Sequence, residues 1–224
     1  MQGIQGAEEQ RSRGAEEPKT PEPPQGTPAP QLLGSSAPLL LSPSVPPRVA
    51  GALNVYLCGL IGSGKTAIGE RLAGRMGRPF LDLDHEMDRE LGRSFHDLVR
   101  ERGWLAFREL EYRLCRRFAG REGIVVALGG GTVRYAWNTD ALRGTGLMIL
   151  LEADLGVLAE RVRTIDRPRV NPGVSLEEDL RRIWSDARHL YEGAADLVYR
   201  TDAGKTLDAE IEELLGELAA RGIR

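Results

Sequence analysis

The residues with the clearest chemical meaning form one short run, Gly59-Leu-Ile-Gly-Ser-Gly-Lys65-Thr66. Its spacing matches the phosphate-binding pattern GxxxxGK[ST]. Glycines let the backbone curl so that its N–H groups point at phosphate oxygens, and the positive end of a following helix adds to that attraction. Lys65 would neutralise the β- and γ-phosphates of a nucleotide, and the Thr66 hydroxyl would ligate Mg²⁺. The run predicts a phosphate site made by Gly59, Gly62, Ser63, Gly64, Lys65 and Thr66.

The scarcity of lysine supports this interpretation. Of the 30 Lys and Arg residues, only Lys19, Lys65 and Lys205 are lysines. At Lys65 a slender point charge can reach between two phosphates, which the planar fork of arginine cannot do. The alternative is a glycine-rich turn with an incidental lysine.

Two carboxylates, Asp82 and Asp84, alternate with leucines at the end of a short apolar run. If this run is a strand, residues two apart project to the same face, so both carboxylates would enter one crevice. One could lie near Mg²⁺ while the other orients or deprotonates a substrate hydroxyl. The alternative is a solvated strand end at which Asp84 caps a helix that starts at His85.

Arg108 and Glu111 are three residues apart and would share one helix face. An arginine held by a glutamate is aimed in advance, and its planar fork matches a substrate carboxylate. The alternative is a surface ion pair that contributes a few tenths of a kcal/mol. Gly129–Gly131 follow the apolar run IVVAL, where three glycines would let a ligand approach the backbone closely, although they could also form a mere turn.

Arg167 lies beside Pro168 in a loop that also holds Arg163 and Arg169. Arginines on a mobile connection can close over phosphates and exclude water, but such loops are also commonly just solvated. Arg188 has no distinguishing signal by itself. The three histidines share no ligand spacing, so we expect them to be structural or exposed.

The elements that would position these residues alternate along the chain from residue 51 onward. This alternation predicts a parallel sheet covered on both faces, with ligands bound beyond the carboxyl ends of its strands. Ser175 and Glu178 have the spacing of a capping box at a helix start. The expected strands are 53–58, 80–83, 124–128, 147–151 and 197–199, and the expected helices are 65–76, 85–91, 94–118, 155–163, 175–191 and 207–221.

The first 50 residues differ in composition from the rest. Ten of the 13 prolines lie between Pro18 and Pro47, and every Phe, Trp and Tyr lies at or after Tyr56. Such a segment cannot bury enough apolar surface to offset its ordering entropy. We therefore expect residues 1–50 to be a disordered, dispensable Pro-rich extension and residues 51–224 to form one domain.

Charge and cysteine content narrow the class of partner. The globular part is close to neutral and has no basic block suited to nucleic acid, and no run approaches the roughly 18 apolar residues of a membrane span. Cys58 and Cys115 have no metal or redox spacing, and Cys58 lies in an apolar run. A buried free thiol at Cys58 fits a reducing cytosol. We expect a cytoplasmic monomer that binds small molecules and neither nucleic acid nor membrane.

Six segments, taken together and in order, resemble the shikimate kinase family over residues 53–221. They are GLIGSGKT, FLDLD, FRELE, LGGGT, the Arg167-Pro168 loop and ARHLY. The resemblance implies a P-loop kinase of the nucleoside-monophosphate-kinase type, an α/β fold with three layers and a five-stranded parallel sheet. A helical substrate-binding insert would span about 84–118, and a lid would span about 164–173. The implied reaction is Mg²⁺-dependent transfer of the ATP γ-phosphate to the 3-hydroxyl of shikimate, on the route to chorismate and aromatic amino acids.

The resemblance also implies a role for each motif residue. Asp84 would be the candidate base, and Asp82 would hold the Mg²⁺ shell through water beside Thr66. Arg108 and Arg188 would bind the shikimate carboxylate, and Glu111 would support Arg108. Gly130 and Gly131 would contact the ring of shikimate, and Arg167 would be the lid arginine that reaches the phosphates. The lid sequence Arg167-Pro-Arg169-Val170 departs from the RPLL that family members often show. The rival interpretations are a kinase for another hydroxy acid, such as gluconate, and a nucleotide-binding relative without kinase activity.

Overall fold

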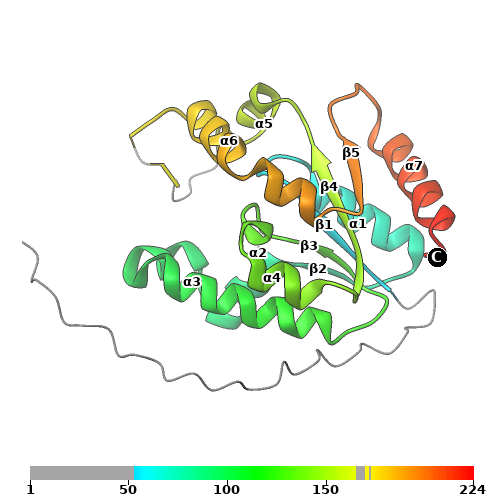
Figure 1. The fold of residues 1–224 in the computed structure, drawn as a ribbon, viewed down its shortest axis with the longest axis horizontal. Coiled ribbons are helices and arrows are strands. Elements are labelled where there is room, and N and C mark those ends of the chain that lie inside the picture. The colour runs from blue at the N-terminus through cyan, green and yellow to red at the C-terminus, as the bar shows by residue number, and fades with distance from the viewer. Residues whose placement is uncertain (1–52, 165–169, 172) are drawn as a thin grey trace, which may run out of the picture. The chain divides into compact units, whose positions relative to one another are not determined.

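A computed structural model describes residues 53–164, 170–171 and 173–224. Within them, five strands form one sheet in the order β2-β3-β1-β4-β5 (Figure 1). Every neighbouring pair is parallel, so the expected five-stranded parallel sheet is confirmed. The central strand is the one that leads into the glycine-rich run. The strands are β1 (Asn54–Cys58), β2 (Phe80–Asp82), β3 (Val125–Ala127), β4 (Gly146–Glu152) and β5 (Leu197–Arg200).

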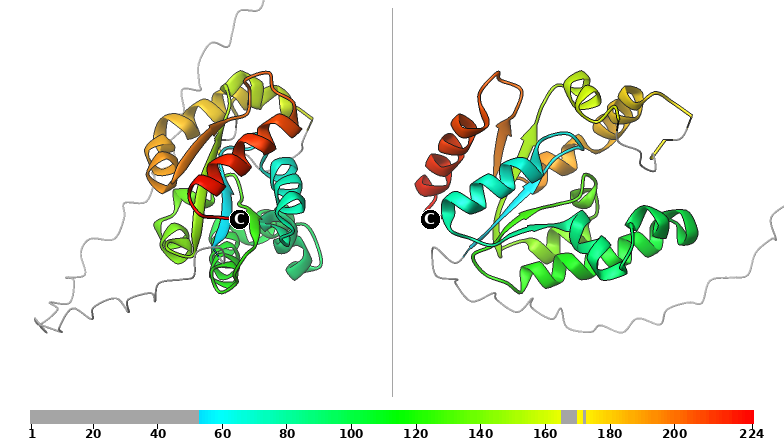
Figure 2. Two further views of the ribbon diagram at one scale, coloured as in Figure 1. Left: turned by 90° about the vertical axis from the view of Figure 1, so that its right-hand side faces the viewer. Right: turned by 180° about the vertical axis from the view of Figure 1, so that it is seen from behind.

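Both faces of the sheet are covered by helices, as the continuous apolar strands predict. Alternate residues of β1 enter two separate cores: Val55 and Leu57 lie in one, and Tyr56 and Cys58 lie in the other. The first core is completed by α1 and α7 and the second by the remaining helices (Figure 2). The helices are α1 (Lys65–Met76), α2 (Leu83–Leu91), α3 (Phe95–Ala119), α4 (Ala136–Leu142), α5 (Leu155–Arg161), α6 (Leu176–Ala194) and α7 (Leu207–Ala220).

Three local features differ from the sequence-based expectation. Strand β2 ends at Asp82 rather than at residue 83, and α2 begins at once. The long helix expected over 94–118 is interrupted at Gly103, whose φ of 76° and ψ of 178° break it into two helical pieces. The stretch between residues 129 and 146, for which the sequence predicts no helix or strand, contains the short 3₁₀ helix η1 (Thr132–Arg134) and α4.

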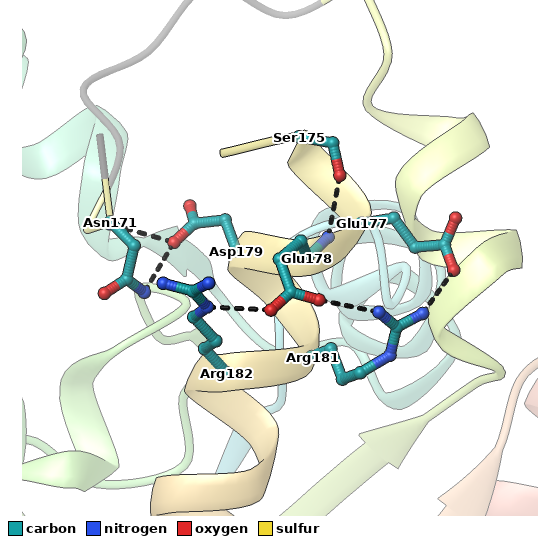
Figure 3. Close-up of polar contacts among 7 residues, drawn as sticks. All are labelled: Asn171, Ser175, Glu177, Glu178, Asp179, Arg181 and Arg182. Atoms are coloured by element: carbon teal, nitrogen blue, oxygen red, sulfur yellow. Dashed lines mark hydrogen bonds and ion pairs between the residues drawn. The ribbon is translucent and has the colours of Figure 1, made fainter. Parts of the chain in front are cut away.

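Helix α6 begins at Leu176, one residue later than expected, with Ser175 as its N-cap (Figure 3). The Ser175 hydroxyl accepts a hydrogen bond from the Glu178 N–H at 3.1 Å, which is the first half of the expected capping box. The Glu178 carboxylate instead pairs with Arg181 and Arg182. Asn171, near the end of the expected lid, donates to the buried Asp179 carboxylate from both its backbone and its amide group, at 2.9 Å each. Helix α6 therefore holds Asn171 in place.

Both cysteines are free and buried, which confirms the expectation for Cys58. Burial raises the pKa of the Cys58 thiol to about 12, so this thiol is neutral and unreactive at physiological pH. No helix among the described residues is long and apolar enough to cross a bilayer. The Pro-rich segment 1–50 and Arg167 lie outside the described residues.

Candidate active site

The glycine-rich run forms a tight loop between β1 and α1, in the position expected of a phosphate-binding loop. Gly59, Gly62 and Gly64 have φ values of 137°, 79° and 92°, which favour glycine. A methyl group on Gly59 would lie 2.3 Å from the carbonyl oxygen of Leu151, so the loop tolerates no side chain there. Helix α1 starts at Lys65 and directs its positive end toward the loop.

Lys65 is held against the loop. Its Nζ donates to the carbonyl oxygens of Gly59 at 3.0 Å and Leu60 at 2.9 Å, and it lies 3.4 Å from the Ser63 hydroxyl. These contacts are bonds to neutral groups, which are weaker than bonds to an anion. The ammonium group is therefore at the loop before any phosphate arrives and can exchange these carbonyls for phosphate oxygens.

Two residues that no motif indicated donate hydrogen bonds to backbone carbonyl groups of the loop. Arg161 Nη1 donates to the carbonyl oxygen of Gly62 at 3.0 Å, and the Thr201 hydroxyl donates to that of Ser63 at 3.1 Å. Arg161 also donates to the Thr201 carbonyl at 2.8 Å. Because these partners are far apart in the chain, no local pattern could have revealed them.

Asp82 and Asp84 take different structural positions, which corrects the expectation that both project from one strand. Asp82 is the N-cap of α2: its Oδ1 accepts from the N–H groups of Asp84 at 3.0 Å and His85 at 3.3 Å. The cap is therefore Asp82 rather than Asp84, because it satisfies N–H groups that the helix leaves without partners. Its other oxygen, Oδ2, accepts from the Thr66 hydroxyl at 2.7 Å.

Asp84 lies in the first turn of α2, and its carboxylate reaches the glycine run after β3. A methyl group on Gly129 would lie 3.1 Å from Asp84 Oδ1. On the next residue, Gly130, a methyl group would lie 3.3 Å from the backbone nitrogen of Ile61 in the phosphate loop. The consecutive glycines thus let the loop after β3 approach both Asp84 and the phosphate loop.

Arg108 and Glu111 form a buried ion pair, which excludes the surface-pair alternative. Arg108 Nη1 donates to Glu111 Oε2 at 2.7 Å, and the two side chains are only 10% and 1% exposed. Glu111 also accepts from the Thr132 hydroxyl at 2.8 Å and from the Asn138 amide at 3.0 Å. Thr132 and Asn138 lie in η1 and α4, where the sequence predicts no element, so no motif indicates their part in the site.

Aromatic rings surround the Arg108 guanidinium. Its central carbon lies 4.3 Å from the ring centroid of Tyr135, 4.6 Å from that of Phe107 and 5.4 Å from that of Trp104. Arg108 Nε is buried and has no hydrogen-bond partner among the residues that the structure describes. Rings at these distances attract the cation and displace water from it. Arg108 is therefore a desolvated cation, which favours an anionic ligand.

These groups meet in one pocket of about 410 Å³, within the usual size range for small-molecule sites. Tyr191, from α6, donates to the carbonyl oxygen of Gly130 at 2.5 Å and so ties the glycine run to that helix. The pocket is lined, among other residues, by Thr66, Asp82, Asp84, Arg108, Gly130 and Gly131. Of the predicted substrate-binding residues, the structure thus brings Asp84, Arg108, Gly130 and Gly131 together.

Arg188, the other arginine that the resemblance assigns to the shikimate carboxylate, does not line this pocket, and its role stays a prediction. Its Nε donates to Glu192 at 2.7 Å, its side chain is 60% exposed, and it lines a second pocket of about 220 Å³. The two pockets adjoin at Leu60, which lines both. The buried face of α6 passes through Ile183 and Ala187, so the next residue, Arg188, is turned away from it.

The fold and the site define a class of protein. A glycine-rich loop joins the central strand of a parallel sheet to a helix, its lysine lies against the loop, and its threonine donates to an aspartate at the end of β2. This is a P-loop kinase of the nucleoside-monophosphate-kinase type, with a pocket next to the phosphate loop.

The chain belongs to the shikimate kinase family, whose model, described as Shikimate kinase, matches residues 61–219. A shikimate kinase from Symbiobacterium thermophilum is 38% identical over 174 residues, 76% of this chain and 100% of the relative. One from Pelotomaculum thermopropionicum is 34% identical over 164 residues, 72% of this chain and 93% of the relative. The solved structure of the shikimate kinase from Acinetobacter baumannii in complex with shikimate has a TM-score of 0.72 at 28% identity, covering 78% of this chain and 97% of that one. The predicted family and the expected ATP-dependent kinase are confirmed.

Proposed function

We propose that this chain transfers the γ-phosphate of ATP to the 3-hydroxyl of shikimate. The main observation that supports this proposal is the pocket, which is lined by Thr66 of the phosphate loop, Asp84 and the desolvated Arg108. An acceptor of this reaction needs a hydroxyl near the phosphate and an anion to pair with a buried arginine. Shikimate has both, and a ligand without a carboxylate would offer no acceptor to the part of the Arg108 guanidinium that Glu111 does not bind, which penalises its binding.

The proposed roles follow from position. Phosphoryl transfer requires mainly positioning and neutralisation of charge. Lys65 and the loop N–H groups hold the phosphates, and Asp84 orients the acceptor hydroxyl and takes its proton. Arg108 holds the acceptor carboxylate, while Glu111 keeps Arg108 in place. By its motif alone, Arg167 is proposed as the lid arginine that reaches the phosphates.

We also propose a Mg²⁺ site at Thr66 and Asp82. The Thr66 hydroxyl and Asp82 Oδ2 lie 2.7 Å apart at the edge of the pocket and offer the hard oxygen atoms that Mg²⁺ prefers. Mg²⁺ usually keeps several waters and needs only one or two protein ligands beside the phosphates, so this pair fits, with Asp82 acting through water. When bound, the ion neutralises charge on the phosphate oxygens.

Purified protein is expected to release ADP from ATP and Mg²⁺ only when shikimate is added. A coupled ADP assay with shikimate, gluconate or no acceptor measures this dependence. Removing Mg²⁺ with EDTA should abolish turnover, and adding excess Mg²⁺ should restore it. Equal activity with gluconate, or without an acceptor, would contradict the proposed substrate.

Replacing Arg108 with alanine is expected to raise KM for shikimate about 10- to 100-fold, because a charge-assisted hydrogen bond contributes about 1.5–3 kcal/mol. KM for ATP should change little. Arg113→Ala is the matched control, because Arg113 is on the same helix but pairs with Glu90 at the surface. A loss of ATP affinity equal to the loss of shikimate affinity would argue against the role proposed for Arg108.

A cytoplasmic location and a monomeric state stay predictions. The two free, buried thiols support a reducing compartment.

A further inference from the structure

Thr201, the first residue after β5, links that strand to the phosphate loop. Its side chain is only 7% exposed. Its backbone N–H donates to the carbonyl oxygen of Glu152, the last residue of β4, at 2.8 Å, so the sheet fixes its position. Its hydroxyl reaches the loop and donates to the carbonyl oxygen of Ser63 at 3.1 Å. The end of an edge strand of the sheet therefore contacts the backbone that the proposed function assigns to the phosphates.

Arg161, the last residue of α5, orients this hydroxyl. Its guanidinium donates to the Thr201 carbonyl at 2.8 Å and to the Thr201 hydroxyl oxygen at 3.3 Å. Arginine can only donate, so the hydroxyl accepts from it and keeps its own proton for a carbonyl oxygen. Two carbonyl oxygens are in range, that of Ser63 at 3.1 Å and that of Glu152 at 3.3 Å. The closer of the two belongs to the phosphate loop.

The loop receives a second bond of this kind, because Arg161 also donates to the carbonyl oxygen of Gly62 at 3.0 Å. Two consecutive carbonyl groups of the loop are thus held from outside it. Such bonds matter because Gly62 and Gly64 have φ values of 79° and 92°, and glycine can adopt φ of either sign. Rotation of the Ser63–Gly64 peptide would take Gly64 to a negative φ at little steric cost. The hydrogen bond from Thr201 opposes this rotation.

The orientation of the Ser63–Gly64 peptide decides which charge faces a phosphate. This peptide bond is trans, so its carbonyl and its N–H point in opposite directions. While Thr201 holds the Ser63 carbonyl, the Gly64 N–H points away from Thr201, and none of the residues that the structure describes accepts a hydrogen bond from it. A rotated peptide would present the carbonyl oxygen instead, whose negative partial charge repels a phosphate.

We infer that Thr201 is a positioning residue for the nucleotide: its hydroxyl, oriented by Arg161, holds the Ser63–Gly64 peptide so that the Gly64 N–H faces the phosphates. The inference rests on the proposed function and adds to it a residue outside the loop motif. Thr201 carries no charge and does not line the pocket of Asp84 and Arg108. It should therefore affect the affinity for phosphate groups and leave the affinity for shikimate unchanged.

The test compares Thr201→Val, which removes the hydroxyl but keeps the shape, with Thr201→Ser, which keeps the hydroxyl. Thr201→Val is expected to raise KM for ATP and Kd for ADP about 3- to 10-fold, the usual effect of losing one neutral hydrogen bond. KM for shikimate should stay within about twofold. Thr201→Ser should keep both nucleotide constants within about twofold of those of the unaltered enzyme.

Thr145→Val is the matched control. Thr145 is 8% exposed, and its hydroxyl also donates to a backbone carbonyl, that of Leu142 at 2.7 Å. It directly precedes β4 and lies beside the first residue of β1, at the opposite end of the sheet from the phosphate loop. The same loss of a buried hydroxyl there should lower stability, as thermal melts report, without changing KM for ATP by more than about twofold.

A second measurement follows the peptide itself. When ADP and Mg²⁺ are added to the unaltered enzyme, the Gly64 amide proton should move downfield in a ¹H–¹⁵N NMR spectrum, because it bonds to a phosphate oxygen. The same movement should be smaller in Thr201→Val and fully present in Thr145→Val. A Gly64 amide that does not respond to ADP would overturn the inference.

Unchanged nucleotide affinity in Thr201→Val would also overturn it, and so would an equal loss in Thr145→Val or in Thr201→Ser. If Thr201→Val does not fold, Thr201→Ala removes the same hydroxyl without adding bulk and allows the same comparison. Failure of the unaltered enzyme to phosphorylate shikimate, with nucleotide binding and the Gly64 response intact, would instead refute the proposed acceptor. The two failures are therefore distinguishable.

Discussion

Replacing Asp84 with asparagine is expected to slow turnover with shikimate about 10²- to 10⁴-fold, the usual contribution of a general base. Asparagine has nearly the same shape and can still bond to a hydroxyl, but it cannot take up the proton. Substrate binding should therefore be largely retained, and KM for ATP should stay within about twofold. Steady-state kinetics with each substrate varied in turn measure the separation of kcat from KM.

The structure strengthens this expectation because Asp84 is not the helix cap. Asp82 performs that task, so the change at Asp84 should not remove a capping interaction and the melting temperature should stay near that of the unaltered protein. Asp97→Asn is the matched control, because Asp97 lies in the first turn of α3 and pairs with Arg100 at the surface. Turnover of Asp84→Asn close to the unaltered rate would remove Asp84 from the role of base.

Replacing Glu111 with alanine is expected to lower the free energy of unfolding by about 3–5 kcal/mol, the typical cost of removing one partner of a buried ion pair. The change leaves the desolvated Arg108 cation without its carboxylate and also deprives Thr132 and Asn138 of an acceptor. Since Arg108 would lose its orientation, KM for shikimate should rise as well. Urea unfolding followed by circular dichroism gives the stability, and kinetics give the second effect.

Glu109→Ala is the matched control for this experiment, because Glu109 is on the same helix but exposed, so it should cost less than about 0.5 kcal/mol. Glu111→Gln keeps the shape and some hydrogen bonds but no charge, and should fall between the alanine variant and the unaltered protein. If Glu111→Ala were as stable as Glu109→Ala, Glu111 would not be the anchor of Arg108 that we propose.

The local patterns of the chain were sufficient to predict the fold and the phosphate loop. The loop is eight consecutive residues, and its glycines adopt positive φ values because of their own chemistry. Strands with uninterrupted apolar sequence have to be covered on both faces, and Val55 and Tyr56 do enter different cores. The pairing of Arg108 with Glu111 was likewise visible, because residues three apart on a helix are neighbours.

Only the tertiary structure decided which of these side chains share a pocket. It made Asp82 the cap and left Asp84 to the pocket, because the helix starts one residue after Asp82. It also provided Glu111 with hydrogen bonds from Thr132 and Asn138. Such partners are far apart in the chain or depend on which face of a helix turns inward. A rotation of about 100° per residue separates neighbours such as Ala187 and Arg188, and the packing of α6 determines which of them faces inward.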